Sequence, residues 1–250
     1  MEGKQALRGA VLALTLLWAA GLVFCTLAPP QAVPAEVTQP TRQPPKLIAL
    51  TFDDGPRRAT TARLLDGLGQ RGVPATFFLI GKQIPDNEDL ILRMEQEGHE
   101  VGIHTFDHVP LTGLNAADFD AQVGKTRRLL QSLLGREDFL LRPPYGYLDS
   151  AVQRRSGAPI ILWSIDPEDW GDKNAQRETE HILQNAQDGA IILLHDIYPA
   201  SVDAALAAVD ELHREGYLFL TVSDLFAARG IPLEAGTAYR HAYPADTPAD

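Results

Sequence analysis

The sequence is poor in cysteine and in positive charge, and each shortage excludes a class of protein. Its 250 residues include a single cysteine, Cys25, so an intrachain disulfide is impossible and a set of thiolate ligands for structural zinc is missing. Lysine and arginine number 22 against 33 aspartates and glutamates, which gives a formal net charge of -11 at pH 7. A chain this acidic lacks the cationic footprint that nucleic-acid binding requires.

Nucleotide-binding signatures are missing as well. Neither a Gly-x-Gly-x-x-Gly sequence nor a Walker sequence follows the first candidate strand, so nothing supports a nucleotide cofactor. The overall composition, with 45% hydrophobic and 22% charged residues, is that of an ordinary globular protein with one sizeable core.

Charge is also absent from the apolar run Gly9–Leu27, which comes after two basic residues. About 19 residues at 1.5 Å each nearly match a hydrocarbon core of roughly 30 Å. The basic residues favour a cytoplasmic amino terminus, so that the rest of the chain is exported. We therefore expect a cytoplasmic stub at residues 1–8 and a transmembrane anchor at residues 9–27. A cleaved signal peptide and a lipoprotein signal at Cys25 are the alternatives.

Two further segments differ in composition from a folded domain. Residues 28–45 are rich in proline and predict an extended, semi-rigid linker. Residues 234–250 mix alanine, proline, threonine and aspartate without apolar periodicity, which predicts a disordered tail. The catalytic domain is therefore expected at residues 46–233.

Short apolar runs alternate with helix-period segments through this domain. The candidate strands are Leu47–Asp53, Ala75–Ile80, Glu100–His104, Phe139–Arg142, Pro159–Ile165, Ala190–His195 and Leu218–Val222. The clearest helical patterns are Thr61–Gln70, Glu88–Gln96, Phe119–Leu134 and Val202–His213. Such alternation predicts an α/β fold with a parallel sheet and crossover helices. We expect a small β/α barrel, with an open doubly wound sheet as the alternative.

Chemically active side chains stand at the carboxyl ends of these candidate strands. They are Asp53, Asp54, His104, Arg142, Asp166 and His195. In β/α barrels the active site is built at this edge. Charges placed only for solubility would not choose one edge so consistently, so we predict a site there.

The pair His104 and His108 indicates a metal site. Two imidazoles four positions apart can face the same side of a turn, although this spacing alone is a weak signal. A third ligand is needed, and an aspartate at a neighbouring strand end is the natural supplier. Three protein ligands leave positions open for water and substrate, which is typical of a catalytic metal.

Five segments together resemble the motifs of the polysaccharide deacetylase family, carbohydrate esterase family four. They are, in the family's order, Thr51–Pro56 (TFDDGP), His104–His108 (HTFDH), Arg142–Gly146 (RPPYG), Asp166–Trp170 (DPEDW) and Leu193–Asp196 (LLHD). The resemblance implies a distorted seven-stranded (β/α) barrel. Each motif alone is moderately specific, but five intact motifs in order are very hard to reach by chance.

The resemblance also implies a metal and a base. Asp54, His104 and His108 would hold a divalent ion, usually Zn²⁺ in the family, with Co²⁺ and similar ions as alternatives. Asp53 would be the general base that activates water. Arg142 would pair with Asp53, and an adjacent arginine favours the ionised form of a carboxylate.

The remaining motif residues would complete the reaction and the acetyl pocket. By the same resemblance, His195 would be the general acid, oriented by Asp166. The backbone amide of Tyr145 would help to hold the oxyanion. Trp170 and Leu193 would line the pocket for the acetyl group, with Tyr145 beside them. We interpret the other motif acids, Asp107 and Asp169, as structural.

The expected function is metal-dependent hydrolysis of N-acetyl groups on N-acetylglucosamine residues of a cell-surface polysaccharide, with peptidoglycan first and chitin-type oligomers second. We expect a monomeric catalytic domain outside the cytoplasm, held at the cell membrane by its anchor or secreted if the leader is cleaved. An O-acetyl-sugar esterase would use the same site. A non-haem iron oxygenase, built on two histidines and a carboxylate, and a carbohydrate-binding domain that has lost catalysis are less favoured alternatives.

Overall fold

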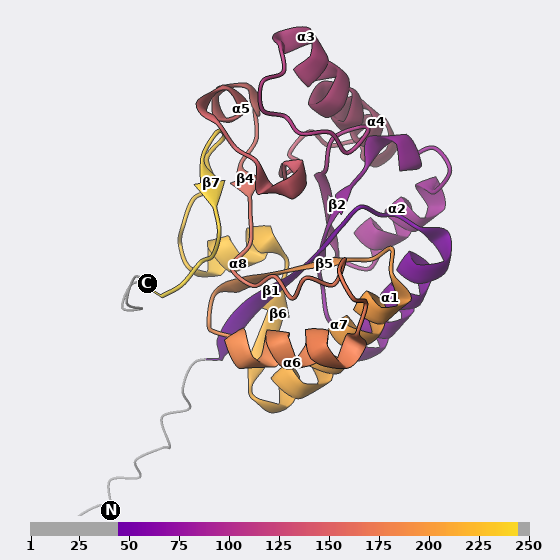
Figure 1. Ribbon diagram of the computed structural model, residues 1–250, viewed down its shortest axis with the longest axis vertical. Coiled ribbons are helices and arrows are strands. Elements are labelled where there is room, and N and C mark those ends of the chain that lie inside the picture. The colour runs from indigo at the N-terminus through magenta and orange to yellow at the C-terminus, as the bar shows by residue number, and fades with distance from the viewer. Residues whose placement is uncertain (1–44, 245–250) are drawn as a thin grey trace, which may run out of the picture. The chain divides into compact units, whose positions relative to one another are not determined.

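A computed structural model describes residues 45–244 of the chain (Figure 1). The expected cytoplasmic stub, membrane anchor and nearly all of the proline-rich linker lie outside the described residues, as do residues 245–250. Among the described helices, none has the length and apolar character needed to cross a membrane.

The fold is built around strand β1, which lies at the centre of a parallel sheet. The strands of this sheet are β1 (Lys46–Asp53), β2 (Thr76–Leu79), β3 (Glu100–Ile103), β5 (Ala190–His195) and β6 (Tyr217–Leu220). Their order is β3-β2-β1-β5, and β6 pairs with the first half of β1. Each matches a strand expected from the sequence to within one or two residues at either end. The α/β fold with a parallel sheet is thus confirmed.

Single parallel bridges carry the sheet beyond β3. They join Ile103 to Leu141, Leu141 to Ile160 and Ile165 to Ile192 of β5. This path from β3 back to β5 is consistent with the expected distorted barrel.

Two of the expected strands are much shorter than the sequence suggested. The first, Phe139–Arg142, contributes only bridges at Leu141, because the prolines after it have no N–H to continue a ladder. The second, Pro159–Ile165, contains only β4 (Ile160–Ile161). Ser164 and Ile165 both donate to the carbonyl of Ile191, so two residues oppose one and the strand is interrupted as in a β-bulge.

Helices cover the outside of the sheet (Figure 1). They are α1 (Arg58–Arg71), α2 (Glu88–Gln96), α3 (Ala116–Phe119), α4 (Lys125–Leu134), α5 (Ser150–Arg155), α6 (Ala175–Asn185), α7 (Pro199–Arg214) and α8 (Val222–Ala228). Short 3₁₀ turns occur at Gly81–Gln83 and Pro144–Gly146. The helix expected at 119–134 is divided, because a π-helical turn at Asp120–Gly124 separates α3 from α4.

Alternate residues of β1 face two different cores. Leu50 and Phe52 belong to the larger core, together with residues of the outer helices. Ala49 belongs to a second core that α8 fills with Val222 and Phe226. Because side chains alternate along a strand, Asp53 points to the same side as Ala49. Asp53, the last residue of β1, therefore points away from the core that the outer helices cover.

The expected disordered tail is wrong for residues 234–244. Strand β7 (Ala238–Tyr239) pairs in parallel with β4, and His241 forms an antiparallel bridge with Ala190 of β5. The ring of Tyr239 packs against Phe226 with centroids 5.0 Å apart. The segment is held by main-chain pairing and one aromatic contact, neither of which produces the apolar periodicity of a helix.

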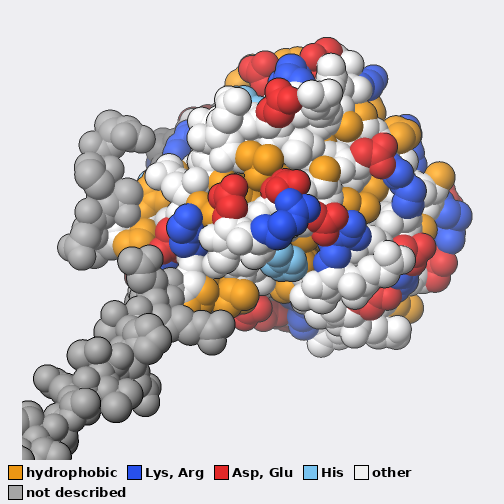
Figure 2. Space-filling view, turned by 90° about the horizontal axis from the view of Figure 1, so that it is seen from below, with side chains coloured by type: hydrophobic (Ala, Val, Ile, Leu, Met, Phe, Trp, Pro, Cys, Tyr) orange, Lys and Arg blue, Asp and Glu red, His pale blue; other side chains and the backbone are white. Residues whose placement is uncertain are grey.

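The face seen from below in Figure 1, where α6 and α7 lie, carries acidic and basic side chains interspersed with one another (Figure 2). Ion pairs on these helices include Arg177 with Asp172 and Arg71 with Asp210, both at 2.8 Å. Exposed pairs of this kind contribute little to stability and mainly keep the surface soluble.

Candidate active site

A cavity of about 490 Å³ opens at the carboxyl ends of β1, β3 and β5. Its walls are Asp53, Asp54, His104, His108, Tyr145, Tyr147, Trp163, Asp166, Trp170, Leu193, His195 and Tyr198. The motif residues expected at strand ends therefore do converge. Successive side chains of a strand point to opposite faces, which explains the arrangement. In each strand that ends in a site residue, the residue directly before it packs into the larger core, so the site residue faces the cavity.

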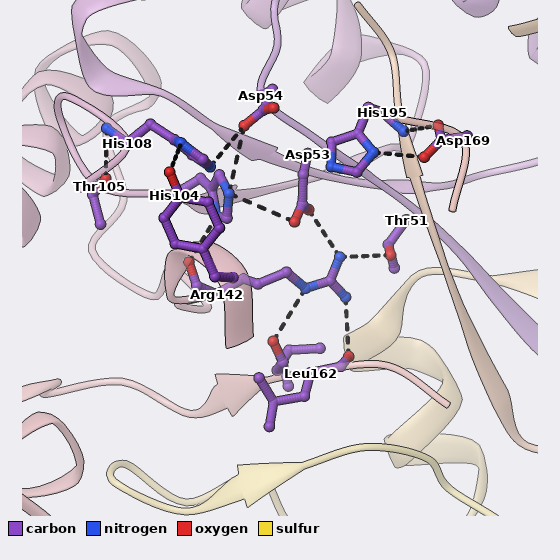
Figure 3. Close-up of polar contacts among 12 residues, drawn as sticks. Thr51, Asp53, Asp54, His104, Thr105, His108, Arg142, Leu162, Asp169 and His195 are labelled. Atoms are coloured by element: carbon purple, nitrogen blue, oxygen red, sulfur yellow. Dashed lines mark hydrogen bonds and ion pairs between the residues drawn. The ribbon is translucent and has the colours of Figure 1, made fainter. Parts of the chain in front are cut away.

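Arg142, which is fully buried, forms an ion pair with the cavity residue Asp53 (Figure 3). Nη1 of Arg142 donates to Oδ1 of Asp53 over 2.8 Å and to the hydroxyl of Thr51 over 2.7 Å. Its Nε and Nη2 donate to the carbonyls of Ile161 and Leu162, both over 3.1 Å. Burial lowers the pKa of Arg142, while the charge and hydrogen bond of Asp53 oppose that effect. The second carboxylate oxygen of Asp53 remains available for chemistry.

The Arg142 guanidinium also rests on an aromatic ring. Its central carbon lies 4.2 Å from the ring centroid of Phe78 on β2. A Cβ at Gly102 of β3 would lie 2.7 Å from a Phe78 ring carbon, so only glycine leaves room for that ring. The guanidinium is thus fixed by hydrogen bonds at its edge and by a cation–π contact on its face.

Asp54, His104 and His108 form the candidate metal centre. Their ligand atoms all lie within 4.8 Å of one another. Oδ1 of Asp54 is 3.6 Å from Nε2 of His104 and 3.3 Å from Nε2 of His108. Nδ1 of His104 donates to the carbonyl of Arg142 over 2.8 Å, which leaves Nε2 as the unprotonated nitrogen that a metal requires.

Two observations support a metal ion at this centre. The buried Oδ1 of Asp54 has no hydrogen-bond partner among the described residues, which is costly for a carboxylate unless a cation satisfies it. Burial lowers the pKa of His108, against the opposing charge of Asp54, and favours the neutral imidazole that binds metals. Two imidazoles and one carboxylate suit a divalent ion with open positions.

Backbone strain is concentrated in the loops of this site. The non-glycine residues with positive φ in residues 45–244 are Asp54, Thr105, His108, Tyr145, Glu168 and Lys173. All six lie in or beside the motifs, and a left-handed conformation is unfavourable for such residues. The hydroxyl of Thr105 accepts from the N–H of His108 over 3.0 Å and holds that turn.

His195 is held by Asp169, not by Asp166 as we expected. Nδ1 of His195 donates to Oδ1 of Asp169 over 2.7 Å, and its backbone N–H donates to Oδ2 over 2.8 Å. Burial alone would lower the pKa of His195, but the hydrogen bond and charge of Asp169 outweigh it and raise the pKa to about 9. The carboxylate of Asp166 instead accepts from the N–H of Glu168 over 2.9 Å.

The prediction for Asp166 fails because of the loop after it. A strand-end rule favours the first acid after the strand, but Glu168 adopts φ of 55° and turns the chain back, so that Asp169 faces β5. Asp169 is fully buried, which no pattern in this short loop indicates. Its place directly before Trp170 in the fourth motif was the one available signal.

Two further buried acids were not anticipated. Asp196 is enclosed beside Gly55 and accepts a short hydrogen bond from Thr61, and burial raises its pKa to about 7. The hydrogen bond ties the end of β5 to α1, and Asp196 also lies against Gly55 in the loop after Asp54. Glu178 of α6 is fully buried with neither oxygen partnered among the described residues, and burial, then the charge of Asp169, raise its pKa to about 7.

Aromatic side chains form the rim of the cavity. Tyr145, Tyr147 and Trp170 expose 55%, 56% and 55% of their surfaces, which is unusual for such large apolar groups. The hydroxyl of Tyr145 lies 3.4 Å from Nδ1 of His108. Leu193 is 4% exposed and gives the cavity an apolar wall.

Together these residues provide the groups that hydrolysis of an acyl bond requires. The candidate metal centre lies next to the ionisable Asp53. Nε2 of His104 is 3.6 Å from Oδ2 of Asp53. In Figure 3, Asp53 lies between the two histidines of the candidate metal centre and His195, which has a carboxylate partner of its own. A candidate base, a candidate acid and a candidate metal centre thus face one cavity.

Comparisons with known proteins agree with this chemistry. A family model described as polysaccharide deacetylase matches residues 41–158. The peptidoglycan-N-acetylmuramic acid deacetylase PdaC of Bacillus subtilis is 39% identical over 194 residues, which are 78% of this chain and 41% of that protein. The chain thus spans less than half the length of this relative.

A shorter relative and a solved structure match over nearly all of their length. A peptidoglycan-N-acetylglucosamine deacetylase of Bacillus cereus is 37% identical over 188 residues, covering 72% of this chain and 88% of that protein. A family 4 acetyl xylan esterase of Clostridium thermocellum, solved in complex with a cobalt ion, superposes with a TM-score of 0.75 at 28% sequence identity. The superposition covers 78% of this chain and 98% of the esterase chain. With all five motifs gathered at one cavity, these matches show that the chain belongs to the polysaccharide deacetylase family.

Proposed function

We propose that this protein hydrolyses the N-acetyl group of N-acetylglucosamine residues in a cell-surface polysaccharide and releases acetate. Peptidoglycan is the first substrate and chitin-type oligomers are the second. One observation carries the proposal: the Asp54–His104–His108 cluster lies in the same cavity as His195 and Asp53, the partner of Arg142. The names of the relatives from Bacillus, which refer to peptidoglycan, support the choice of polymer.

The metal would be held by Asp54, His104 and His108, with Zn²⁺ proposed first and Co²⁺ as an alternative. A bound divalent ion polarises the acetyl carbonyl and lowers the pKa of a water molecule from near 16 toward roughly 7. The donor set of two nitrogens and one carboxylate suits zinc. The cobalt complex of the structural relative supports a divalent ion without fixing which one.

Asp53 would act as the general base. Its Oδ1 is engaged by Arg142, so Oδ2, which faces the metal centre, is the oxygen available to take a proton from the attacking water. Nη1 of Arg142, 2.8 Å from Oδ1, places a fixed positive charge beside this buried carboxylate. As the water oxygen bonds to the acetyl carbon, its proton passes to Asp53.

His195 would act as the general acid. Its pKa of about 9 keeps it protonated at neutral pH, and Asp169 holds Nδ1, so Nε2 is the nitrogen that can donate. When the C–N bond of the acetamide breaks, the departing nitrogen takes this proton and leaves as an amine. Water and the amide are thereby converted into acetate and a free amino sugar.

The remaining motif residues would bind the acetyl group. The apolar wall of Leu193 and the ring of Trp170 would accept the methyl group and reduce the access of bulk water. The backbone N–H of Tyr145 would donate to the oxygen that becomes negative in the transition state. Tyr145 adopts φ of 62°, a strained conformation of the kind found at functional sites.

An O-acetyl-sugar esterase is the second candidate, and one observation favours it. The chain superposes on an acetyl xylan esterase with a TM-score of 0.75, although its sequence identity to that esterase, 28%, is lower than the 37% to the Bacillus cereus enzyme. An alcohol is a better leaving group than an amine, so the same residues suffice. The two activities differ in their need for an acid, because an amine must be protonated to leave.

The proposed place of action is outside the cytoplasm. The charge-free run at residues 9–27 and its preceding basic residues support a single membrane anchor, and residues 28–45 would hold a monomeric domain near the wall. Cleavage of the leader would release the same domain.

Acetate release by the full-length protein tests the proposed function. With zinc added, we expect acetate from acetylated wall fragments and from chitooligomers. Asp53→Asn should abolish turnover but retain zinc, whereas His104→Ala should lose both activity and zinc, as measured by elemental analysis. Full release of acetate by Asp53→Asn would overturn the assignment of the base. Glycan binding without release of acetate from any substrate would indicate a non-catalytic domain.

A further inference from the structure

Two basic side chains lie next to Tyr198, a residue of the cavity wall. Tyr198 lines the cavity, and its ring centroid lies 6.3 Å from that of His195. Nζ of Lys173 lies 4.4 Å from the centroid of the Tyr198 ring. Nη1 of Arg57 donates to the carbonyl of Ile197, the residue before Tyr198, over 3.2 Å. One cation thus lies over the ring of Tyr198, and the other contacts the backbone of the residue before it.

Among the residues that the structure describes, these two cations have no acidic partner. Most arginines of the described domain pair with a carboxylate, as Arg58 does with Asp89 at 2.7 Å. Within residues 45–244, neither Lys173 nor Arg57 has a carboxylate within 4.0 Å of its nitrogens. Both side chains are exposed, and the chain carries a net charge of -11. Free positive charge beside such an acidic cavity is therefore available to a ligand.

The position of Lys173 is set by its loop. It adopts φ of 53°, one of the strained conformations found around the site. Asp172 before it is held by Arg177 at 2.8 Å, and Asn174 after it caps α6 by accepting from the N–H of Arg177. The residue is thus presented from a fixed turn, not from a free loop tip.

The other side of the rim is aromatic but uncharged. The rings of Tyr145 and Tyr147 lie 5.5 Å apart, and that of Tyr145 lies 4.9 Å from His108. In Figure 3, His108 and His195 lie on opposite sides of Asp53. A glycan with its acetamide over Asp53 would place one neighbouring sugar against the two tyrosines and the other against Tyr198.

We propose that Lys173, Arg57 and Tyr198 form a subsite for a carboxylate-bearing sugar next to the sugar that is deacetylated. A ring face suits the apolar face of a sugar, and two free cations suit its carboxylate. The proposal rests on the proposed function and narrows its substrate class, because it favours glycans with alternating acidic sugars over neutral chitin-type chains. None of the three residues touches the reacting bond, so the subsite acts on KM and leaves kcat unchanged.

The test compares two acidic glycans with a neutral one, using the full-length protein loaded with zinc. The acidic substrates are hyaluronan fragments and wall glycan strands freed of peptide, and the neutral substrate is a chitooligomer of equal length. We expect a lower KM on the acidic glycans and a rise of KM with salt on these alone. The double variant Lys173→Gln/Arg57→Gln should raise KM on the acidic glycans roughly three- to tenfold, as expected for exposed charge pairs, and leave the chitooligomer unaffected.

Matched controls separate the subsite from the overall charge. Lys82→Gln and Arg154→Gln remove two exposed cations outside the cavity. They should change neither the KM for acidic glycans nor the KM for the chitooligomer. Lys173→Glu should make acidic glycans poorer substrates than the chitooligomer. Equal kcat/KM of the wild type on acidic and neutral glycans, or an equal loss on both in the double variant, would overturn the subsite.

A failure of the proposed function would be distinguishable from a failure of the subsite. If no glycan releases acetate, the proposed function fails, and calorimetric binding of the hyaluronan fragment decides the subsite. Binding by the wild type that the double variant weakens would support the subsite. Equal binding by both proteins, or none by either, would overturn it.

Discussion

Nδ1 of His195 donates to Oδ1 of Asp169 over 2.7 Å, although 26 positions separate the two residues in the chain. Asp169 is fully buried, and it also accepts from the backbone N–H of the same histidine. The orientation of His195 thus depends on one carboxylate. The hydrogen bond and the charge of Asp169, with smaller effects of Asp53 and Asp54, outweigh the effect of burial on the pKa of the imidazole.

The deacetylase activity should fall at high pH because His195 loses its proton. The acid must be protonated, and its pKa is about 9, so kcat/KM should fall as the pH rises above about 9. Asp169→Asn removes the charge that raises this pKa, so the fall should move to lower pH and cost roughly tenfold or more at pH 8. A pH–rate profile measures both effects.

Asp166→Asn is the matched control for that profile. Its carboxylate bonds its own loop at Glu168 and makes no hydrogen bond with His195 among the described contacts. The alkaline fall should therefore stay near pH 9 in this variant. A shift in Asp166→Asn with none in Asp169→Asn would favour Asp166 as the residue that orients His195 and contradict the geometry.

Removal of metal should abolish acetate release reversibly. A chelator competes for the ion that Asp54, His104 and His108 would hold, and added Zn²⁺ or Co²⁺ should restore the rate. His108→Ala removes one of three ligands and should weaken zinc binding by at least about tenfold, as followed by metal titration. His181→Ala, on α6 outside the cavity, is the control and should bind zinc normally. Full activity after exhaustive chelation would exclude a metal-dependent reaction.

Loss of Arg142 should destabilise the domain as well as inactivate it. Arg142→Met leaves Asp53 buried without its cation, which costs about 3–5 kcal/mol of the free energy of unfolding. Thermal or denaturant unfolding measures this loss. The double variant Arg142→Met/Asp53→Asn removes the stranded charge and should regain part of the stability. A double variant no more stable than Arg142→Met would show that packing, not charge, explains the loss.

The strand ends of the site were predictable, and the loops were not. Asp53, His104 and His195 come after apolar runs, and the alternation of a parallel strand carries each of them to the same edge. Asp169 could not be placed, because its direction depends on the left-handed turn at Glu168, and a glutamate gives no local signal for such a turn.

The periodicity of apolar residues also could not predict which main-chain segments pair. Strand β7 has two residues and joins β4 only after the chain has passed around the sheet. The strand expected at Phe139–Arg142 has the right composition, yet the prolines after it limit it to bridges at Leu141. Composition predicts which side chains suit a strand but does not state which backbone groups find partners.

Glu178 should make the domain less stable as the pH rises from about 4.5 to 7. Burial, and then the charge of Asp169, raise the pKa of Glu178 from 4.5 to about 7. The folded chain therefore binds more protons than the unfolded chain in this range, so the free energy of unfolding falls with increasing pH. Glu178→Gln removes this cost and should raise the melting temperature at pH 8 but not at pH 4. Glu180→Gln, a change at an exposed position on the same helix, should leave the melting temperature unchanged at both pH values. Equal melting temperatures for wild type and Glu178→Gln at pH 8 would mean that the buried carboxyl is satisfied by a water or an ion.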